Sequence, residues 1–308
     1  MSRLIHATDH LPKHRAPWLG TAVGALFVAT SGVFVSLSGT SPGTASVYRC
    51  ALALPFLALL AFRERRGETP PSQRRPGLAL AAGTLFSVDM LLWTQAIAEV
   101  GAGLSAVIVN LQVVLVPALA WLVDREPVTR RYLLAMPVVL LGVVLTSGLL
   151  DGGGTGADPV AGTIHAALAA LCYSGFLFLL RRSGRRGQTV RSYLAMMASA
   201  ALVSAVLGAV WTGVDLFPGW AAVGWLLLVA VCGQVLGWLL VAVCLPHLSS
   251  QVGAVLLLLT PVGALVLGAV VLAERPTPLQ LVGCALILGG VLVIAGVRAV
   301  RSRSRAFP

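Results

Sequence analysis

The chain has 308 residues, of which 57% are hydrophobic and 11% are charged. Soluble domains carry about 25% charged residues, so this composition excludes an ordinary water-soluble protein. The net charge of +11 does not indicate nucleic-acid binding, because the basic residues separate apolar runs of 18 or more residues instead of forming one face.

The cysteines argue against a metal site and against a disulfide framework. They stand singly along the chain, and no CxxC spacing occurs. We therefore predict no metal and no cofactor, and we expect the cysteines to be small core residues: Cys50, Cys172, Cys232, Cys244 and Cys284.

Ten apolar runs follow a polar and basic tail at residues 1–17. A membrane-spanning helix needs about 20 apolar residues, and a helix satisfies its own backbone hydrogen bonds in lipid. The first run is longer than the apolar part of a signal peptide, so we interpret it as a membrane helix. We predict an all-α polytopic membrane protein with transmembrane helices at residues 18–38, 46–62, 77–97, 103–123, 132–150, 160–180, 192–212, 219–243, 250–272 and 279–298.

The placement of the basic residues predicts how the chain lies in the membrane. With a cytoplasmic N-terminus, 20 of the 22 lysines and arginines fall on the cytoplasmic side, and only Arg49 and Arg275 fall outside. Positively charged loops stay in the cytoplasm. We therefore predict an integral protein of the cell (inner) membrane with both termini cytoplasmic, including a basic tail at residues 299–308.

The second half of the chain repeats the plan of the first. Glu126 and Thr129 recur as Glu274 and Thr277, 148 positions later. Because each half has five spans, an odd number, the second half enters the membrane from the opposite side. Inverted repeats of this kind build secondary transporters, with the binding site near the midplane between the halves. The predicted segments are a first repeat at 18–150, an external linker at 151–159 and a second repeat at 160–298.

Several short segments stand at corresponding places in the two halves or at helix junctions. They are Glu126-Pro127 and Glu274-Arg275-Pro276, Gly142-Val143 and Gly290-Val291, Val47-Tyr48-Arg49, and Leu92-Trp93-Thr94-Gln95-Ala96 leading into Gly103-Leu104-Ser105-Ala106. In these features the chain resembles the drug/metabolite transporter superfamily, in its EamA-domain branch, over residues 18–298. The resemblance implies a ten-helix carrier made of two five-helix repeats, and an exporter of amino acids or related metabolites.

The chain departs from this pattern in the two central helices. Pro261 has Val113 as its repeat partner, and the proline of the first half stands at Pro117. We expect the two helices to kink at different depths, because a proline bends a helix where it removes a hydrogen bond.

Asp89 is the outstanding polar residue inside a predicted span. It lies near the middle of the third span, and we expect no basic residue in any span core to pair with it. Ionisable groups in a membrane mark a pathway by default, and an unpaired buried carboxyl takes up a proton. We interpret Asp89 as a proton-coupling group or as a partner for a cationic substrate; the alternative is a structural acid with a local hydrogen bond.

Two tryptophans lie deeper in the membrane than the others. Trp93 stands one turn from Asp89, and Gln234 and Trp238 repeat the same spacing in the eighth span. We predict that these faces form opposite walls of one cavity. An ordinary packed tryptophan beside an interhelical glutamine is the alternative.

Other polar residues are weaker candidates. Asn110 and Gln112 face different directions on one helix; we expect Asn110 to line the cavity and Gln112 to join helices. His165, near the outer surface, is a second candidate for proton coupling. The resemblance alone implies further lining residues: Ser31, Tyr173 and Phe176.

Two charge pairs are candidate gates. Arg49 and Glu274 are predicted to lie together on the outer side, and Arg191 and Glu126 on the inner side. Each pair would close one end of the pathway, as alternating access requires.

These features predict a secondary active transporter that exports amino acids or related small metabolites by alternating access. Neither a Walker motif nor an HExxH sequence occurs, so we expect neither direct ATP drive nor an enzyme. Proton coupling and facilitated exchange both remain open. The alternatives are a non-transporting scaffold or sensor, and a carrier of another solute class. The expected partners are a small-molecule solute and the lipid bilayer, without nucleic acid. A homodimer packed through small residues such as Gly283, Ala285, Gly289 and Gly290 is compatible with the pattern.

Overall fold

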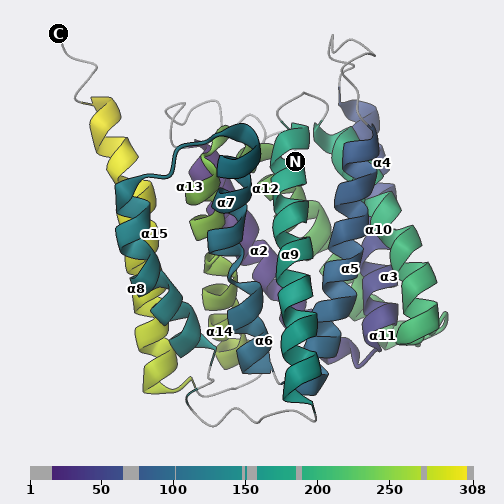
Figure 1. The fold of residues 1–308 in the computed structure, drawn as a ribbon. Helices are drawn as coiled ribbons and strands as arrows, with labels where there is room; N and C mark the ends of the chain where they lie inside the picture. The colour runs from purple at the N-terminus through teal and green to yellow at the C-terminus, as the bar shows by residue number, and fades with distance from the viewer. Residues whose placement is uncertain are drawn as a thin grey trace.

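The computed structural model describes residues 16–64, 76–100, 102–147, 150, 158–184, 189–271 and 276–303, and these ranges contain helices and turns without strands (Figure 1). In chain order the first half holds α2 (Ala16–Ser38), α3 (Pro42–Ala51), α4 (Ala53–Arg63), α5 (Pro76–Val100), α6 (Ala102–Val109), α7 (Gln112–Asp124) and α8 (Arg130–Thr146). The second half holds α9 (Pro159–Gly184), α10 (Thr189–Trp211), α11 (Trp220–Leu228), the π-helix η4 (Val229–Trp238), α12 (Leu239–Cys244), the short 3₁₀ turn η5 (Leu245–His247), α13 (Ser250–Leu256), α14 (Leu259–Val271) and α15 (Pro278–Arg303).

A helical segment occurs at each of the ten predicted positions. Eight of the described segments are long and apolar enough to cross a membrane. Of the two that close the halves, α8 has 17 residues, and α15 has 26, with an apolar part that includes Pro278–Ile294. The prediction of an all-α polytopic membrane protein is therefore confirmed.

The second span begins earlier than the apolar run predicted. The Ser41 side chain accepts a hydrogen bond from the Thr44 backbone N–H, and Pro42 occupies the first turn of α3. The segment then continues from α3 through Leu52 into α4. Pro55 falls in the first turn of α4, where its missing N–H costs no hydrogen bond. As a result the span covers Pro42–Arg63 rather than 46–62.

In each half, the first helix packs against helices of the other half, so the two halves exchange contacts. In one direction α5, α6 and α7 pack on α9; in the other, η4, α12, α13 and α14 pack on α2. The pairs α8 with α15 and α3 with α10 each join corresponding helices of the two halves, and α7 packs on α13, so the predicted fourth and ninth spans also meet. Figure 1 shows α8 and α15 side by side at one edge of the bundle. This exchange is what two repeats related by a pseudo-two-fold axis produce.

Two glycines allow the central helices to approach closely. A Cβ at Gly83 of α5 would overlap the backbone carbonyl of Met196 on α10, and one at Gly237 of η4 would overlap Val28 of α2. Small residues at such contacts let helix backbones meet in a membrane, where close packing drives helix association. These contacts bring α5 against α10 and η4 against α2.

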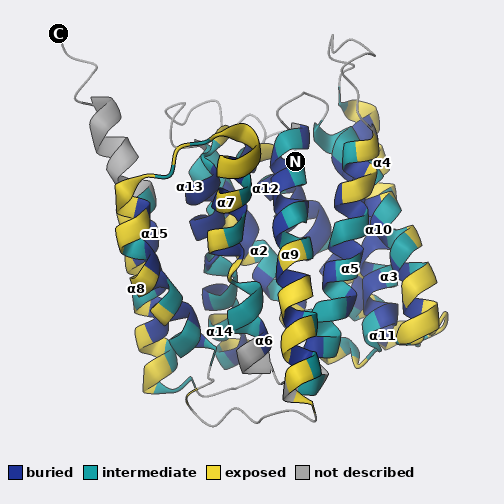
Figure 2. Ribbon diagram, in the orientation of Figure 1, coloured by how far each residue is buried: buried dark blue, intermediate teal, exposed yellow. Residues whose placement is uncertain are grey.

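The outward faces of the bundle are apolar and the polar residues face inward. Phe62, Leu134, Val210 and Val270 are among the most exposed hydrophobic side chains. Figure 2 shows exposed positions along the outer faces of α8, α9 and α15. In contrast, Ser87 and Ser204 form a buried hydrogen bond between α5 and α10, with 2.8 Å between their hydroxyl oxygens. This is the arrangement expected when lipid replaces water as the surrounding solvent.

Candidate functional site

Asp89 lies in the buried centre of α5. The residue is 1% exposed, and neither carboxyl oxygen has a hydrogen-bond partner among the described residues. The indole N–H of Trp93, one helical turn away, is also buried and without a hydrogen-bond partner. An unpartnered carboxyl and an unpartnered donor on one helix face leave hydrogen-bonding capacity at this position for a ligand.

Arg49 lies in the same region, contrary to the expectation that no basic residue occupies a span core. It is the eighth residue of α3 and is 9% exposed. Its Nη1 donates to the Met90 sulfur at 3.3 Å, and its guanidinium lies 5.8 Å from the centre of the Phe86 ring. The sequence placed Arg49 at the outer end because the span was predicted to begin at 46, whereas the Ser41 cap starts the helix one turn earlier.

Gln234 of η4 holds the guanidinium from the second half of the chain. With its amide oxygen turned toward Arg49, it accepts hydrogen bonds from Nε at 2.6 Å and from Nη2 at 2.8 Å. Its amide nitrogen then donates to the Tyr193 hydroxyl at 3.2 Å, and that hydroxyl donates to the Gln234 backbone carbonyl at 3.1 Å. The chain of contacts therefore runs from α3 through η4 to α10, and all three side chains are buried.

Four aromatic rings pack beside these polar groups. Trp238 of η4 contacts Phe176 and Tyr173 of α9 and Phe86 of α5, with ring centres 5.2, 6.1 and 5.9 Å apart. The structure thus brings together Trp238, Tyr173 and Phe176, three of the predicted lining residues. Phe86, which sequence reasoning missed, joins them to Arg49.

Ser31 and Asn110, predicted to line the cavity, and Gln112, predicted to join helices, make different contacts. The Ser31 hydroxyl of α2 is buried without a hydrogen-bond partner and lies against Gly233 of η4. The Asn110 side chain donates to the Ala106 carbonyl of its own helix at 2.8 Å. Gln112 is buried and donates to the Ala254 carbonyl of α13 at 3.1 Å, so it joins the two halves.

His165 lies in a separate cluster near the start of α9. Its Nδ1 is 2.5 Å from Oε2 of Glu99, whose other carboxyl oxygen accepts a hydrogen bond from Gln95 at 2.7 Å. Burial by itself raises the pKa of Glu99, but these hydrogen bonds outweigh it and hold the pKa below its usual value. The His165–Glu99 pair therefore joins α5 to α9 at the end of the bundle away from Glu126.

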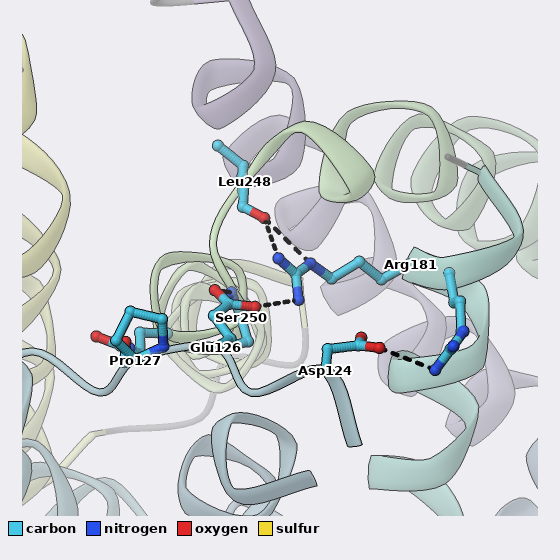
Figure 3. Close-up of polar contacts among 8 residues, drawn as sticks. Asp124, Glu126, Pro127, Arg181, Leu248 and Ser250 are labelled. Atoms are coloured by element: carbon cyan, nitrogen blue, oxygen red, sulfur yellow. Dashed lines mark hydrogen bonds and ion pairs between the residues drawn. The ribbon is translucent and has the colours of Figure 1, made fainter. Parts of the chain in front are cut away.

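The opposite end of the bundle carries a larger polar cluster, which we call the Glu126 cluster (Figure 3). Glu126 accepts from Arg181 Nη1 at 2.7 Å and from the Ser250 backbone N–H at 2.8 Å. Arg181 also donates from Nε and Nη2 to the Leu248 carbonyl at 3.1 and 2.8 Å. The cluster therefore ties the α7–α8 loop of the first half to α9 and to the turn before α13.

Gln251 and Thr129 extend the Glu126 cluster. The Gln251 amide donates to the Pro127 carbonyl and accepts from the Thr129 hydroxyl, each at 2.8 Å. Burial alone raises the pKa of Glu126, but the Arg181 and Ser250 hydrogen bonds hold it below its usual 4.5. Glu126 is accordingly a charged group at neutral pH.

Of the two predicted gate pairs, the inner one, Arg191 with Glu126, is not formed among the described residues. Arg191 donates to the Ala61 carbonyl at 3.3 Å, and its backbone N–H donates to Glu64, so Arg181 and not Arg191 binds Glu126. The sequence could not select between them, because both arginines flank the same loop. Of the outer pair, Arg49 binds Gln234, and Glu274 lies outside the described residues.

The two halves each match one family model. The model of the EamA-like transporter family fits residues 17–148 and again residues 160–296. The chain belongs to the EamA-like transporter family. The predicted resemblance is therefore confirmed, and each match in this EamA protein covers five of the ten predicted spans, which are built from α2 to α8 in the first half and from α9 to α15 in the second.

A solved crystal structure of a protein supports the fold of this EamA protein. It is similar with a TM-score of 0.77 and 19% sequence identity, over 92% of this chain and 98% of that one. At this identity the likeness concerns the fold alone. No curated protein matches the chain significantly. The family is one of transporters and not of enzymes, so the EamA protein is an integral membrane protein of a transporter type.

Proposed function

We propose that this EamA protein is a secondary transporter that exports amino acids or related small metabolites by alternating access. One observation carries the proposal: Asp89, a carboxyl without a hydrogen-bond partner, is buried between two EamA repeats beside Trp93 and near Arg49. Ionisable groups are expensive in a membrane interior, and they persist there where a solute or an ion needs them.

The solute site in this proposal lies between the repeats. It comprises Asp89 and Trp93 of α5, Arg49 of α3, and Gln234 and Trp238 of η4. Residues from both halves contribute, so a rocking motion of one half against the other would open the site first to one side and then to the other. The π-helix supports this assignment, because π-helical turns occur frequently at functional sites.

The Glu126 cluster is the closed gate of the proposed cycle. Its contacts between Arg181, Glu126 and Ser250 cross from one half to the other. The arginine distribution of the chain supports a position for this end on the cytoplasmic side of the inner membrane, together with both termini. Opening it requires breaking a charge-assisted hydrogen bond between the buried Arg181 and the partly buried Glu126, and this bond stabilises the closed state.

The surroundings of Asp89 support a role for it in proton coupling. Among the described residues no hydrogen-bond donor stabilises the charged form of this carboxyl, so the buried group takes up a proton. A positive charge beside it, from a bound solute or from Arg49, would stabilise the carboxylate and so promote release of the proton. His165, paired with Glu99 near the other end, is the second proposed proton-binding group.

The test is solute flux in lipid vesicles that contain the purified protein, driven by a pH gradient. We expect saturable flux for the wild type and loss of its pH-dependent part for Asp89→Asn, with an unchanged melting temperature. Asp215→Asn is a matched control, because Asp215 lies in an exposed loop and its side chain only accepts from the Phe217 N–H. Unaltered pH dependence in Asp89→Asn would remove proton coupling at this residue, and absence of saturable flux in the wild type would overturn the transporter proposal.

A further inference from the structure

We propose that, in the amino acid whose transport is proposed above, Arg49 binds the carboxylate and Asp89 binds the protonated amine. This inference rests on the proposed transport function and specifies what the site recognises. It starts from the contacts of Arg49, which sequence reasoning had placed at an outer gate.

The charge of Arg49 has no anionic partner within hydrogen-bonding distance in the described structure. Its three hydrogen bonds go to the Gln234 amide oxygen and to the Met90 sulfur, which are neutral. A guanidinium has five N–H donors, so two of them have no acceptor here. An arginine remains charged in proteins, and a buried charge is costly unless a counter-charge lies against it. The site therefore has an unfilled requirement for an anion.

Asp89 has the complementary requirement. Both of its oxygens are buried without a donor, and it lies near enough to Arg49 for the two charges to interact. Even so, no ion pair within 4.0 Å joins them among the described residues. The two groups occupy neighbouring places without neutralising one another directly.

The architecture explains why Arg49 and Asp89 stay apart. Gln234 holds the guanidinium by two hydrogen bonds, and Tyr193 fixes Gln234 from α10. Arg49 is thus held by the second half of the chain, whereas Asp89 belongs to α5 of the first half. A solute with a negative and a positive group can bridge the two, and each buried charge then gains a partner while the net charge of the site stays unchanged.

The aromatic rings beside Arg49 suit the rest of such a solute. Phe86 contacts both the guanidinium and Trp238, and Tyr173 and Phe176 complete the group. Rings of this kind bury apolar surface, so they favour an apolar or aromatic side chain on the carbon that carries the two charged groups.

The first test compares three probes of matched shape in vesicles: phenylalanine, 2-phenylethylamine, which lacks the carboxylate, and 3-phenylpropanoate, which lacks the amine. Each probe competes at pH 7 against the counterflow of labelled phenylalanine. If another of the twenty amino acids gives a larger flux, that amino acid is labelled instead, and the probes are its own analogues without the carboxylate and without the amine. We expect inhibition by the amino acid at concentrations at least tenfold lower than by either analogue. Equal inhibition by the amine would overturn the role of Arg49 while leaving transport intact. No saturable flux of any amino acid, amine or acid would instead overturn the proposed function.

The second test places an anion against Arg49 from within the protein. Gln234→Glu keeps the shape of the side chain and supplies the carboxylate, so we expect the melting temperature to stay or rise and the affinity for the amino acid to fall at least tenfold. Gln280→Glu is the matched control, because the Gln280 side chain accepts from the Thr277 N–H at the start of α15. We expect no change in affinity there. Undiminished affinity in Gln234→Glu would contradict the proposal.

Arg49→Lys and Arg49→Gln complete the series. Lysine keeps the charge and loses the planar fork, so preference for the amino acid over the amine should be reduced but present. Glutamine removes the charge, and we expect that preference to vanish. Should Arg49→Gln fail to fold, Gln234→Glu still decides the matter, since it leaves Arg49 in place.

Discussion

Arg181 and Glu126 join the two EamA repeats through one ion pair, with 2.7 Å between Nη1 and Oε2. Their side chains are 5% and 17% exposed. Removing one partner from a buried pair costs about 3–5 kcal/mol, because the other charge stays buried and unpaired. We expect Arg181→Gln to lower the free energy of unfolding in detergent by about 3 kcal/mol, measured by denaturant titration. The double variant with Glu126→Gln should lose less than the sum of the two single losses.

Arg182 provides the control for this prediction. It pairs with Asp124 at 2.9 Å in the same region, but its side chain is 34% exposed. Exposed ion pairs contribute about 0–1 kcal/mol, because water and salt screen them. Arg182→Gln should therefore change the free energy of unfolding by less than about 1 kcal/mol. If Arg182→Gln lowered the free energy of unfolding as much as Arg181→Gln, burial would not determine how much each ion pair stabilises the protein.

Glu126 predicts how the stability of the protein depends on pH. Its pKa is held below the usual 4.5 because the Arg181 and Ser250 hydrogen bonds outweigh its burial. A carboxyl with a lowered pKa stabilises the folded state above its unfolded pKa and loses this contribution as the pH falls through the folded pKa. We expect melting temperatures to be insensitive to Glu126 protonation from pH 7 to about 5, and to fall below about pH 4. Glu126→Gln should melt lower at pH 7 and show a smaller decrease in acid.

Gly83 predicts a packing limit between α5 and α10. A Cβ at this position would overlap the Met196 carbonyl, which belongs to the backbone and has little room to move. Overpacking of a close contact costs about 1–3 kcal/mol, so Gly83→Ala should lower the melting temperature. At Gly224 of α11 a Cβ would meet open space. Gly224→Ala should be neutral or stabilising by up to about 1 kcal/mol, because alanine is the better helix former.

Asp89 predicts a separation of stability from activity. The carboxyl is buried without a hydrogen-bond partner, so replacing it by an amide of the same shape removes no hydrogen bond. We expect Asp89→Asn to melt at the same or a higher temperature while it loses pH-dependent flux, as residues kept for function rather than stability do. A melting temperature lowered by many degrees would instead assign Asp89 a structural role.

The sequence alone was sufficient for the architecture. Apolar runs of membrane-spanning length, punctuated by arginines, predict ten helical segments, since a chain in lipid satisfies its backbone by forming helices. The recurrence of Glu126 as Glu274 predicts two repeats, and the family match agrees. Asp89 was also identifiable, because a carboxyl is conspicuous in a long apolar run.

Only the tertiary structure decided which polar groups meet. The Ser41 cap, and not the hydropathy of the run, sets where α3 begins, and this carries Arg49 into the interior beside Phe86 and Gln234. Likewise Arg181 and Arg191 flank the same loop in the sequence, yet it is Arg181 and not Arg191 that binds Glu126 in the described structure. Whether an apolar run forms a membrane helix is a local property, which the residue types of that run determine. A side-chain pair across two halves depends on where helices begin and how they pack, and this information lies in the whole chain at once.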